Sequence, residues 1–497
     1  MRNERLTAVD TAYVRMETPR TPMHTARLLI FRLPPGEGET WVESLVAEMR
    51  RTPPRSGLYV RRLAETGRWR RNYRWVRDEA IDLDHHVRYW RLPDPGGDAE
   101  LRGVLHKAFT PALDMKRPLW ECHVFGNLAG GRFALLLKTH HAAQDGFGAT
   151  GYLRRWLSED SGHGGLAGPW GLDEPDNAAS TVPITHARRS WIPRGSGKAR
   201  RPFRQRVPGT QLWTWAESLC VRRRARRAQS SNPGGGLLLA MAVPQTPLNR
   251  RLSSERNFAH CTFDLRRFRA IGERAEATVN EVAMTVIGGA LRSYLTERGA
   301  LPERPLVASV PVGLPRTDGK TGNAGTALFC TLGTDHADAA VRLAAVTAGS
   351  RYAKAALTEL PTDIVEQLTA SATWRLHSGQ MLHLSRWRKP FFNVAISNGI
   401  YGHKPLYFRG AVLELSHPCS VVFDGHALNI TIVGYVDRLT MAFSGCPTAT
   451  PDLDRLAALT EEALAALEAA LGTGRHFEEA ERMATPVPLV IEARKAG

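Results

Sequence analysis

Apolar and polar residues follow one another along this chain in two distinct patterns. Short apolar runs of strand length occur, for example, at residues 25–33 and 306–312. Elsewhere apolar residues recur every three or four positions, which predicts helices such as 41–50 and 451–471, the last ending at Gly472. Strand patterns and helix patterns therefore succeed one another along the chain.

The C-terminal part of the chain shows the strand pattern most densely. Apolar runs at residues 391–398, 412–415 and 421–423 predict three short strands. Two more runs, at residues 428–435 and 439–443, flank a two-residue turn and predict a β-hairpin. These strand-like runs belong to the expected second domain.

A β-hairpin followed by a helix is the clearest local prediction in the first half. Two apolar runs flank the adjacent glycines Gly130 and Gly131, and the second run has apolar residues on both faces. This second strand ends at His140 and His141. A loop of small residues follows, and helical spacing then predicts a helix at about residues 148–159.

The residues at the end of this strand carry the candidate chemistry. An imidazole titrates near neutrality, so His141 can take a proton from a hydroxyl that attacks a carbonyl and return it to the leaving group. Asp145, four positions on, can hold the loop in place, and Gly146 allows close approach of the backbone to a ligand. We interpret His141 as a general base and His140 as its structural neighbour.

Two other interpretations of the histidine pair stay open at this point. Both side chains could be satisfied polar residues at a strand end without any catalytic role. His141 and Asp145 could also share a cation, but no HExxH pattern and no Cys partner accompany them. We expect no metal site.

The length of the chain indicates more than one domain. At 497 residues it exceeds what a single hydrophobic core supports, and its composition changes in the middle to Gly, Pro, Ser and Arg. We expect a first domain over residues 1–160, a basic crossover linker over 161–240, a second domain over 241–475, and a loose tail over 476–497.

Positive charge concentrates in the linker. The chain has a net charge of +17, and about thirteen Lys or Arg residues lie between Arg188 and Arg227 against the single acidic residue Glu217. Such a segment favours an anionic partner: nucleic acid, an acidic membrane surface or a phosphate-bearing ligand such as coenzyme A. A tryptophan-bearing basic helix at 211–227 would suit a membrane interface, and a solvated linker helix is the alternative.

Cysteines and apolar runs indicate the compartment. The six cysteines lack CxxC spacing, which favours reduced thiols in a cytoplasmic protein over a disulfide framework or a zinc site. The longest apolar runs, such as residues 237–243, are too short to cross a bilayer, and no long apolar core follows the N-terminus. We expect neither secretion nor a membrane span, and peripheral contact with the inner membrane surface stays open.

Several motifs together resemble one family. The sequence HHAAQDG resembles the HHxxxDG motif of coenzyme A-dependent acyltransferases, which chloramphenicol acetyltransferase-like folds and peptide synthetase condensation domains share. Further stretches narrow the resemblance: LTAVDTAYVRMETPRTPMH, RPLWE, TVNEVAMTVIGGALRSYL, SNGIYGHKPLYFRGAVLEL and DGHALNITIVGYVDRLTMAF. In this order they are similar to the bacterial wax ester synthase and acyl-CoA:diacylglycerol acyltransferase family.

The resemblance implies a fold and an activity. The expected fold is α/β, with two chloramphenicol acetyltransferase-like domains whose mixed β-sheets are flanked by helices, joined by a long crossover, and with an active-site tunnel between them. The expected activity transfers a fatty acyl group from acyl-CoA to the hydroxyl of diacylglycerol or a long-chain alcohol, giving triacylglycerol or wax ester. Acyl-CoA is then a substrate, no cofactor is needed, and nucleic acid is not an expected partner.

The resemblance also assigns residues. By position, His141 is the base, Asp145 orders its loop, Asn280 lies near the reacting centre, and Leu119 and Trp120 are structural supports. The chain departs from the family at two places. Glu follows Asn280 where the family has Asp, and residues 399–402 replace a Pro-Gly-Pro stretch, which concerns the acceptor side.

Two other functions compete with this one. A condensing enzyme of secondary metabolism would take its acyl group from a carrier protein, which the basic linker could dock. A non-catalytic lipid or nucleic-acid binder would use the basic segment alone, and its salt-dependent binding would survive loss of both histidines.

Overall fold

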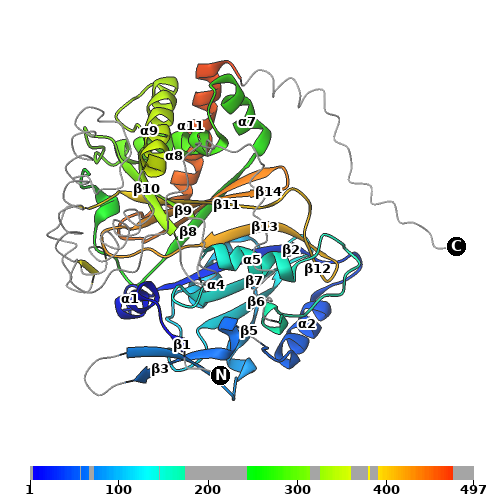
Figure 1. The fold of residues 1–497 in the computed structure, drawn as a ribbon. Helices are drawn as coiled ribbons and strands as arrows, with labels where there is room; N and C mark the ends of the chain where they lie inside the picture. Colours follow the sequence, from blue (N-terminus) through cyan, green and yellow to red (C-terminus); the bar gives the residue numbers. More distant parts are fainter. Residues whose placement is uncertain are drawn as a thin grey trace, which may run out of the picture.

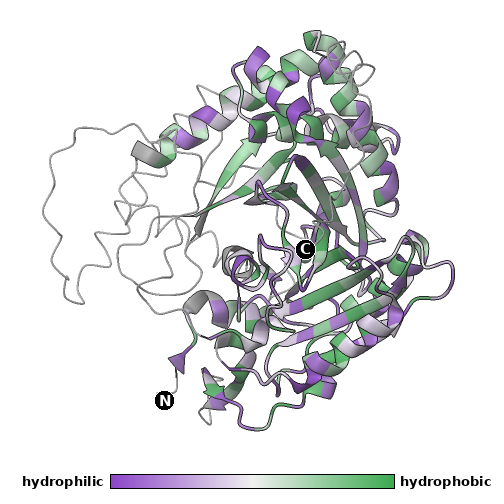
Figure 2. Ribbon diagram, turned by 90° about the vertical axis from the view of Figure 1, so that its right-hand side faces the viewer, coloured by the Kyte–Doolittle hydropathy of each residue, from purple (hydrophilic) through white to green (hydrophobic). Residues whose placement is uncertain are grey.

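Two six-stranded mixed sheets form the centre of the protein (Figure 1). The structure is a computed structural model, and it describes residues 4–55, 57–66, 72–144, 146–173, 243–313, 325–359 and 390–473, with residues 376, 379 and 380. Figure 2 shows that the strands of both sheets are largely hydrophobic, whereas the surrounding helices also carry hydrophilic residues. The core therefore follows the sheets.

The first sheet is built mainly from the N-terminal part of the chain. In spatial order its strands are β12 (Tyr407–Phe408), β13 (Ala411–Cys419), β2 (His24–Arg32), β7 (Arg132–His140), β6 (Trp120–Leu128) and β5 (Val87–Arg91). The β5–β6 pair is parallel and the other pairs are antiparallel. Helices α2 (Glu39–Arg51) and α5 (Gly146–Trp156) cover one face, and α4 (Asp98–Phe109) covers the other.

Strand β7 is buried on both faces of this sheet. Phe133 and Leu135 pack in the cluster under α2 and α5, whereas Ala134 and Leu136 pack in the cluster under α4. This arrangement confirms the prediction drawn from its apolar run. The glycines of the preceding turn have positive φ angles, +79° at Gly130 and +65° at Gly131, as a tight hairpin requires.

The second sheet belongs to the C-terminal part. Its strands, in spatial order, are β10 (Gly325–Thr331), β9 (Val307–Gly313), β11 (Val394–Gly402), β14 (Leu428–Tyr435), β15 (Arg438–Gly445) and β8 (Asn257–Asp264). Four helices pack on it through one large apolar cluster: α7 (Leu265–Arg274), α8 (Val279–Thr296), α9 (Ala339–Glu359) and α11 (Leu453–Leu471). Figure 1 shows these helices together on the side away from the first sheet.

The second half of the chain contributes two strands to the first sheet. We expected residues 241–475 to form a separate domain, but β12 and β13 lie in the first sheet, where β13 pairs antiparallel with β2 (Figure 1, orange beside blue). Apolar pattern alone does not choose between two sheets, because a buried strand reads the same in either. The first sheet is therefore completed by the second half of the chain.

Most of the other predicted elements are present. The hairpin β14–β15 and helix α11 agree with the expected ranges, and Gly472 ends α11 in the left-handed conformation, with φ of +70°. Residues 421–423 are not a strand: only an isolated bridge joins Phe423 to His426. Val421 and Val422 are apolar because they pack in small core clusters. The expected helix at 211–227 lies outside the described residues.

A short helix and a small sheet complete the N-terminal half. Helix α1 (Ala8–Met16) begins at Thr7, whose side chain accepts a hydrogen bond from the N–H of Asp10. The small sheet contains β1 (Glu4–Arg5), β4 (Asn72–Arg77) and β3 (Arg61–Thr66), and a four-residue helix, α3 (Leu83–His86), precedes β5. Among the described helices, none combines the length and the apolar character needed to span a bilayer.

A buried charged cluster joins three strands of the first sheet. Glu121 on β6 lies opposite Lys138 on β7, with 3.4 Å between Oε2 and Nζ, and the two side chains are 7% and 0% exposed. The ring of His123 lies 3.0 Å from Glu121, and Arg88 on β5 lies 3.4 Å from it. Burial raises the pKa of Glu121, but the hydrogen bond with His123 and the charge of Lys138 outweigh it and lower that pKa to about 2.

The same lysine anchors the end of helix α4. The Lys138 amine donates to the carbonyls of Ala108 (3.3 Å) and Pro111 (2.5 Å). Ala108 lies in the last turn of α4 and Pro111 lies in the loop that follows. Carbonyl groups at the C-terminal end of a helix have no partner within the helix, so the lysine amine supplies them with a hydrogen-bond donor and a positive charge. The buried lysine thus fixes the α4 loop against strand β7.

We predict that Glu121→Gln destabilises the protein in a pH-dependent way. A carboxylate whose pKa falls on folding stabilises the folded state above its unfolded pKa, near 4.5, and loses this contribution as pH falls toward 2. The urea unfolding free energy should therefore fall by something on the order of 3 kcal/mol at pH 6, and the deficit should shrink below pH 4.5.

The control is Glu37→Gln, since Glu37 is exposed in a turn. It should leave the unfolding free energy within about 0.5 kcal/mol of the parent value at every pH. A deficit in Glu121→Gln that stays constant from pH 6 to pH 3.5 would contradict the assignment of this ion cluster.

Candidate active site

The two histidines lie where strand β7 ends in the middle of the first sheet. His140 is the last residue of β7 and pairs across the ladder with His24 of β2. The backbone N–H of His141 donates to the carbonyl of Met23 (2.8 Å), and the N–H of Ala143 donates to the carbonyl of His140 (2.9 Å). The histidines therefore begin a tight turn that is bonded to the neighbouring strand.

His140 is wholly buried and both its ring nitrogens are engaged. Nδ1 accepts the backbone N–H of Ala142 (3.0 Å), so the proton resides on Nε2, which donates to the carboxylate of Glu17 (3.2 Å). A side chain with no exposed surface cannot meet a substrate. His140 consequently positions the turn, whereas His141, the other member of the pair, is partly exposed.

Glu17 is a site residue that sequence reasoning missed. It follows helix α1. Its Oε2 accepts a hydrogen bond from Nε2 of His140 and another from the backbone N–H of Met23 (2.5 Å). Glu17 and His140 are 123 positions apart, so spacing gives no hint of the contact. The available signal was the proline-marked turn between Pro19 and Pro22, which brings the end of α1 back to β2.

His141 is partly exposed, and one face of its ring is covered by an aromatic side chain. It stacks on Tyr13 of helix α1, with ring centroids 4.1 Å apart and an angle of 15° between the planes. Helix α1 and the residue after it thus contact the turn with two side chains, Tyr13 against His141 and Glu17 against His140. The arrangement restricts the rotation of the imidazole while leaving part of it accessible.

Of the other two residues expected in the site from this motif, the structure describes Gly146 but not Asp145. Gly146 is the first residue of α5. Asp145 lies outside the described residues, so its expected part in ordering the loop stays a prediction. Within the described ranges no group of three or more metal-ligating side chains comes together.

Asn280 lies at the start of helix α8, in the second half. Thr278 caps this helix and forms a reciprocal capping box with Glu281, whose carboxylate also bonds to Lys354 (3.0 Å). Burial raises the pKa of Glu281, but the bonds from Thr278 and Lys354 outweigh it and keep that pKa below its ordinary value. The side-chain oxygen of Asn280, a partly buried residue, accepts a hydrogen bond from the amide of Asn398 on β11 (2.8 Å).

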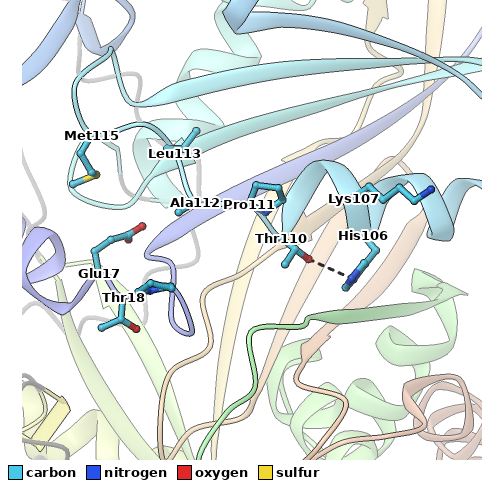
Figure 3. A pocket seen from close by; sticks show the side chains of 10 residues that line it. Glu17, Thr18, His106, Lys107, Thr110, Pro111, Ala112, Leu113 and Met115 are labelled. Carbon is cyan, nitrogen blue, oxygen red and sulfur yellow. Dashed lines mark hydrogen bonds between the residues drawn. The ribbon is translucent and has the colours of Figure 1, made fainter.

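A cavity of about 650 Å³ lies between the end of α1 and the loop after α4 (Figure 3). One wall is formed by residues 17–19 after α1, and the other by the last turn of α4 and its loop, residues 106–115. Glu17 of the first wall bonds to His140, and Leu113 of the second packs in one small cluster with Ala142. The cavity therefore adjoins the turn that carries His141.

Comparison with known proteins identifies the family. Residues 6–283 match the family model of the wax ester synthase/diacylglycerol acyltransferase catalytic domain, and residues 321–468 match its C-terminal domain. A putative diacylglycerol O-acyltransferase of Mycobacterium tuberculosis is 31% identical over 468 residues, 94% of this chain and 99% of the relative. The chain belongs to the wax ester synthase/diacylglycerol acyltransferase family. The resemblance drawn from the order of the motifs is confirmed.

Solved structures agree with this family and with the expected fold. The wax ester synthase/diacylglycerol acyltransferase from Marinobacter aquaeolei VT8 superposes with a TM-score of 0.73 at 30% identity, covering 94% of this chain and all of that one. The first condensation domain of the calcium-dependent antibiotic synthetase, at 16% identity and a TM-score of 0.53, shares the fold, with 95% and 96% covered. The protein is an acyltransferase of this α/β fold.

The departure from the family at residues 399–402 has a structural consequence. Strand β11 continues through this segment and pairs with β14 in parallel as far as Gly402, with a bulge after Ile400. A proline within this segment would lack the N–H that such pairing uses. Ile400 is 54% exposed, whereas Tyr401 is buried under the guanidinium of Arg27.

We predict that Tyr13→Leu lowers acyl transfer about tenfold, because a stacked aromatic pair contributes up to about 1.5 kcal/mol to holding the imidazole of His141. Tyr13→Phe keeps the ring face and should retain most of the activity. Initial rates with acyl-CoA and a long-chain alcohol measure both variants, with circular dichroism to verify folding. Equal rates for Tyr13→Leu and the parent would rule out this role.

Proposed function

We propose that this chain transfers a fatty acyl group from acyl-CoA to the hydroxyl of diacylglycerol or a long-chain alcohol, with His141 as the general base. The observation that carries the proposal is the difference in burial and hydrogen bonding between the two histidines. His140 is buried with both nitrogens engaged, whereas His141 is partly exposed beside a cavity. Membership of the family supports the reaction type.

The reaction proceeds by direct transfer. His141 takes the proton of the acceptor hydroxyl while the hydroxyl oxygen forms a bond to the thioester carbonyl carbon. The carbon–sulfur bond then breaks, and the imidazolium returns the proton to the departing thiolate of coenzyme A. The products are an ester and free coenzyme A, and no covalent acyl-enzyme is required.

Other site residues have supporting roles in this proposal. Asp145 orders the loop after His141, and Gly146, at the start of α5, lets the backbone approach the substrate closely. Asn280, joined to Asn398, orients a polar group of one substrate from the second half of the protein. The exposed Ile400, on the extended strand β11, borders the acceptor side in this proposal.

We also propose peripheral contact with an anionic membrane or lipid-droplet surface. The support is the cationic segment from Arg188 to Arg227 and the apolar acceptors that the reaction uses. This segment lies outside the described residues. Sedimentation with vesicles containing anionic lipid, at low and high salt, tests the contact.

We predict that His141→Ala lowers turnover by about 10²- to 10⁴-fold, as expected for the loss of a general base. The control is His163→Ala, which removes an exposed imidazole beyond α5 and should leave the rate unchanged. Ester formation is followed by mass spectrometry with a panel of acyl-CoAs, alcohols and diacylglycerol. Ester formation by His141→Ala at the parent rate would refute the proposed base.

A further inference from the structure

The small sheet of the N-terminal half, formed by β1, β4 and β3, carries a high density of positive charge. Among residues 61–77, which include β3 and β4, seven are arginine, one is acidic and none is lysine. The connection between the two strands, residues 67–71, lies outside the described residues. Figure 1 shows the sheet at the edge of the first half, beside α1.

One face of this sheet, the inner face, packs against the protein. Side chains directly opposite one another in an antiparallel ladder point to the same face. Leu63 lies opposite Trp75, and both pack in one small apolar cluster with Tyr13 of α1. Tyr13 in turn stacks on the ring of His141. The inner face therefore supports the helix that covers the proposed base.

The opposite face, the outer face, contains three arginines. Arg74 on β4 lies opposite Arg5 of β1 on one side and Ala64 of β3 on the other. Arg62 lies opposite Val76 on the same face. Arg5 is exposed, and Arg62 and Arg74 are partly exposed. The outer face is thus a cationic surface that solvent reaches.

The acidic residues of the three strands do not neutralise the outer face. Both of them, Glu4 and Glu65, lie opposite aromatic residues of β4, so they belong to the inner face. Glu4 pairs there with Arg61, at 2.7 Å. The strand register therefore separates the carboxylates from the arginines of the outer face.

Two arginines of the outer face are directly opposed. Cβ atoms in such a cross-strand pair are about 5 Å apart, and like charges at this position destabilise a sheet. Among the described residues neither Arg5 nor Arg74 has an ion-pair partner, whereas Arg62 lies 3.9 Å from Asp78. An anion bound between Arg5 and Arg74 would remove their repulsion.

We propose that the outer face docks on the anionic phospholipid surface of a membrane, with lipid phosphates bound by Arg5, Arg62 and Arg74. The inference rests on the proposed function, because it assigns the membrane contact of that proposal to a described surface. Guanidinium groups bind a phosphate through two parallel hydrogen bonds, which accords with a sheet that uses arginine and no lysine. Ala64 and Val76 add small apolar side chains between the arginines, as suits a membrane interface.

The position of the sheet favours a membrane over an acidic protein as the partner. The acceptors of the proposed reaction are apolar lipids, which dissolve in membranes and hardly at all in water. Because the inner face packs on α1 and Tyr13 of α1 stacks on His141, docking through the outer face brings the membrane to the part of the protein that carries the proposed base. An acidic protein partner would give this placement no purpose.

The first test measures binding without turnover. The double variant Arg5→Gln/Arg74→Gln should lower the partition coefficient onto phosphatidylglycerol-containing vesicles about 30-fold at low salt, since each arginine near an anionic surface contributes roughly fivefold. Sedimentation of the protein with the vesicles measures this coefficient. Thermal unfolding should show no loss of stability, because the variant removes a pair of like charges.

The matched control removes the same charge from the second half. Arg269 and Arg274 are exposed on α7, which Figure 1 shows at the opposite end of the protein from β1 and β3. Arg269→Gln/Arg274→Gln should change the partition coefficient less than about twofold, because salt screens charges that lie far from the membrane. Equal losses in the two double variants would overturn the proposal, as would parent-like partition of Arg5→Gln/Arg74→Gln.

A second measurement separates docking from chemistry. With acyl-CoA and a water-soluble short-chain alcohol, in the absence of vesicles, Arg5→Gln/Arg74→Gln should form ester at the parent rate. Its transfer to diacylglycerol held in anionic vesicles should fall together with the partition coefficient. Equal rates for the variant and the parent in the vesicle assay would contradict docking through the outer face.

The outcomes distinguish this inference from the proposed function. A parent chain that partitions through the outer face yet forms no ester would refute the proposed function and leave the docking surface standing. Ester formation by the parent, with unchanged partition in Arg5→Gln/Arg74→Gln, would refute the docking surface alone. Weaker binding of an acyl-carrier protein by this variant, with unchanged vesicle partition, would assign the outer face to a protein partner and overturn the proposal.

Discussion

The hydrogen bonds of His140 are the constraint on which the candidate site depends. The ring is buried at the end of a strand, so each nitrogen needs a partner, and the two partners come from different parts of the chain, Ala142 and Glu17. Strand β7, the turn after it and the end of helix α1 are thereby held as one unit. The orientation of His141 follows from this unit, because Tyr13 of the same helix stacks on its ring.

The polar end of strand β7 organises both walls of the cavity. Side chains two positions apart on a strand point to the same face, and Lys138 and His140 both follow Leu136, which faces α4. Lys138 bonds to carbonyls at the end of α4, and His140 bonds to Glu17 after α1. One face of a single strand thus sets the distance between the two segments that form the cavity.

The second half of the chain supports this site although it contributes few residues to it. Strand β13 pairs along β2, the strand that lies beside β7 and holds the backbone of His141 through Met23. Arg256 connects the turn after α1 to the end of α4. The pairing of β13 with β2 and the bonds of this arginine join the second half to the segments around the site, so removing either half would open the site.

The sequence by itself determined the elements, the family and the identity of the histidine pair. Periodic apolar residues specify strands and helices locally, the hairpin glycines fix the turn before β7, and the order of motifs selects the family. Tertiary structure alone decided the sheet to which β13 belongs, the partnership of Glu17 with His140, and the cavity between two distant segments. These features depend on contacts between residues that lie far apart in the chain, and side-chain spacing along the sequence carries no record of such contacts.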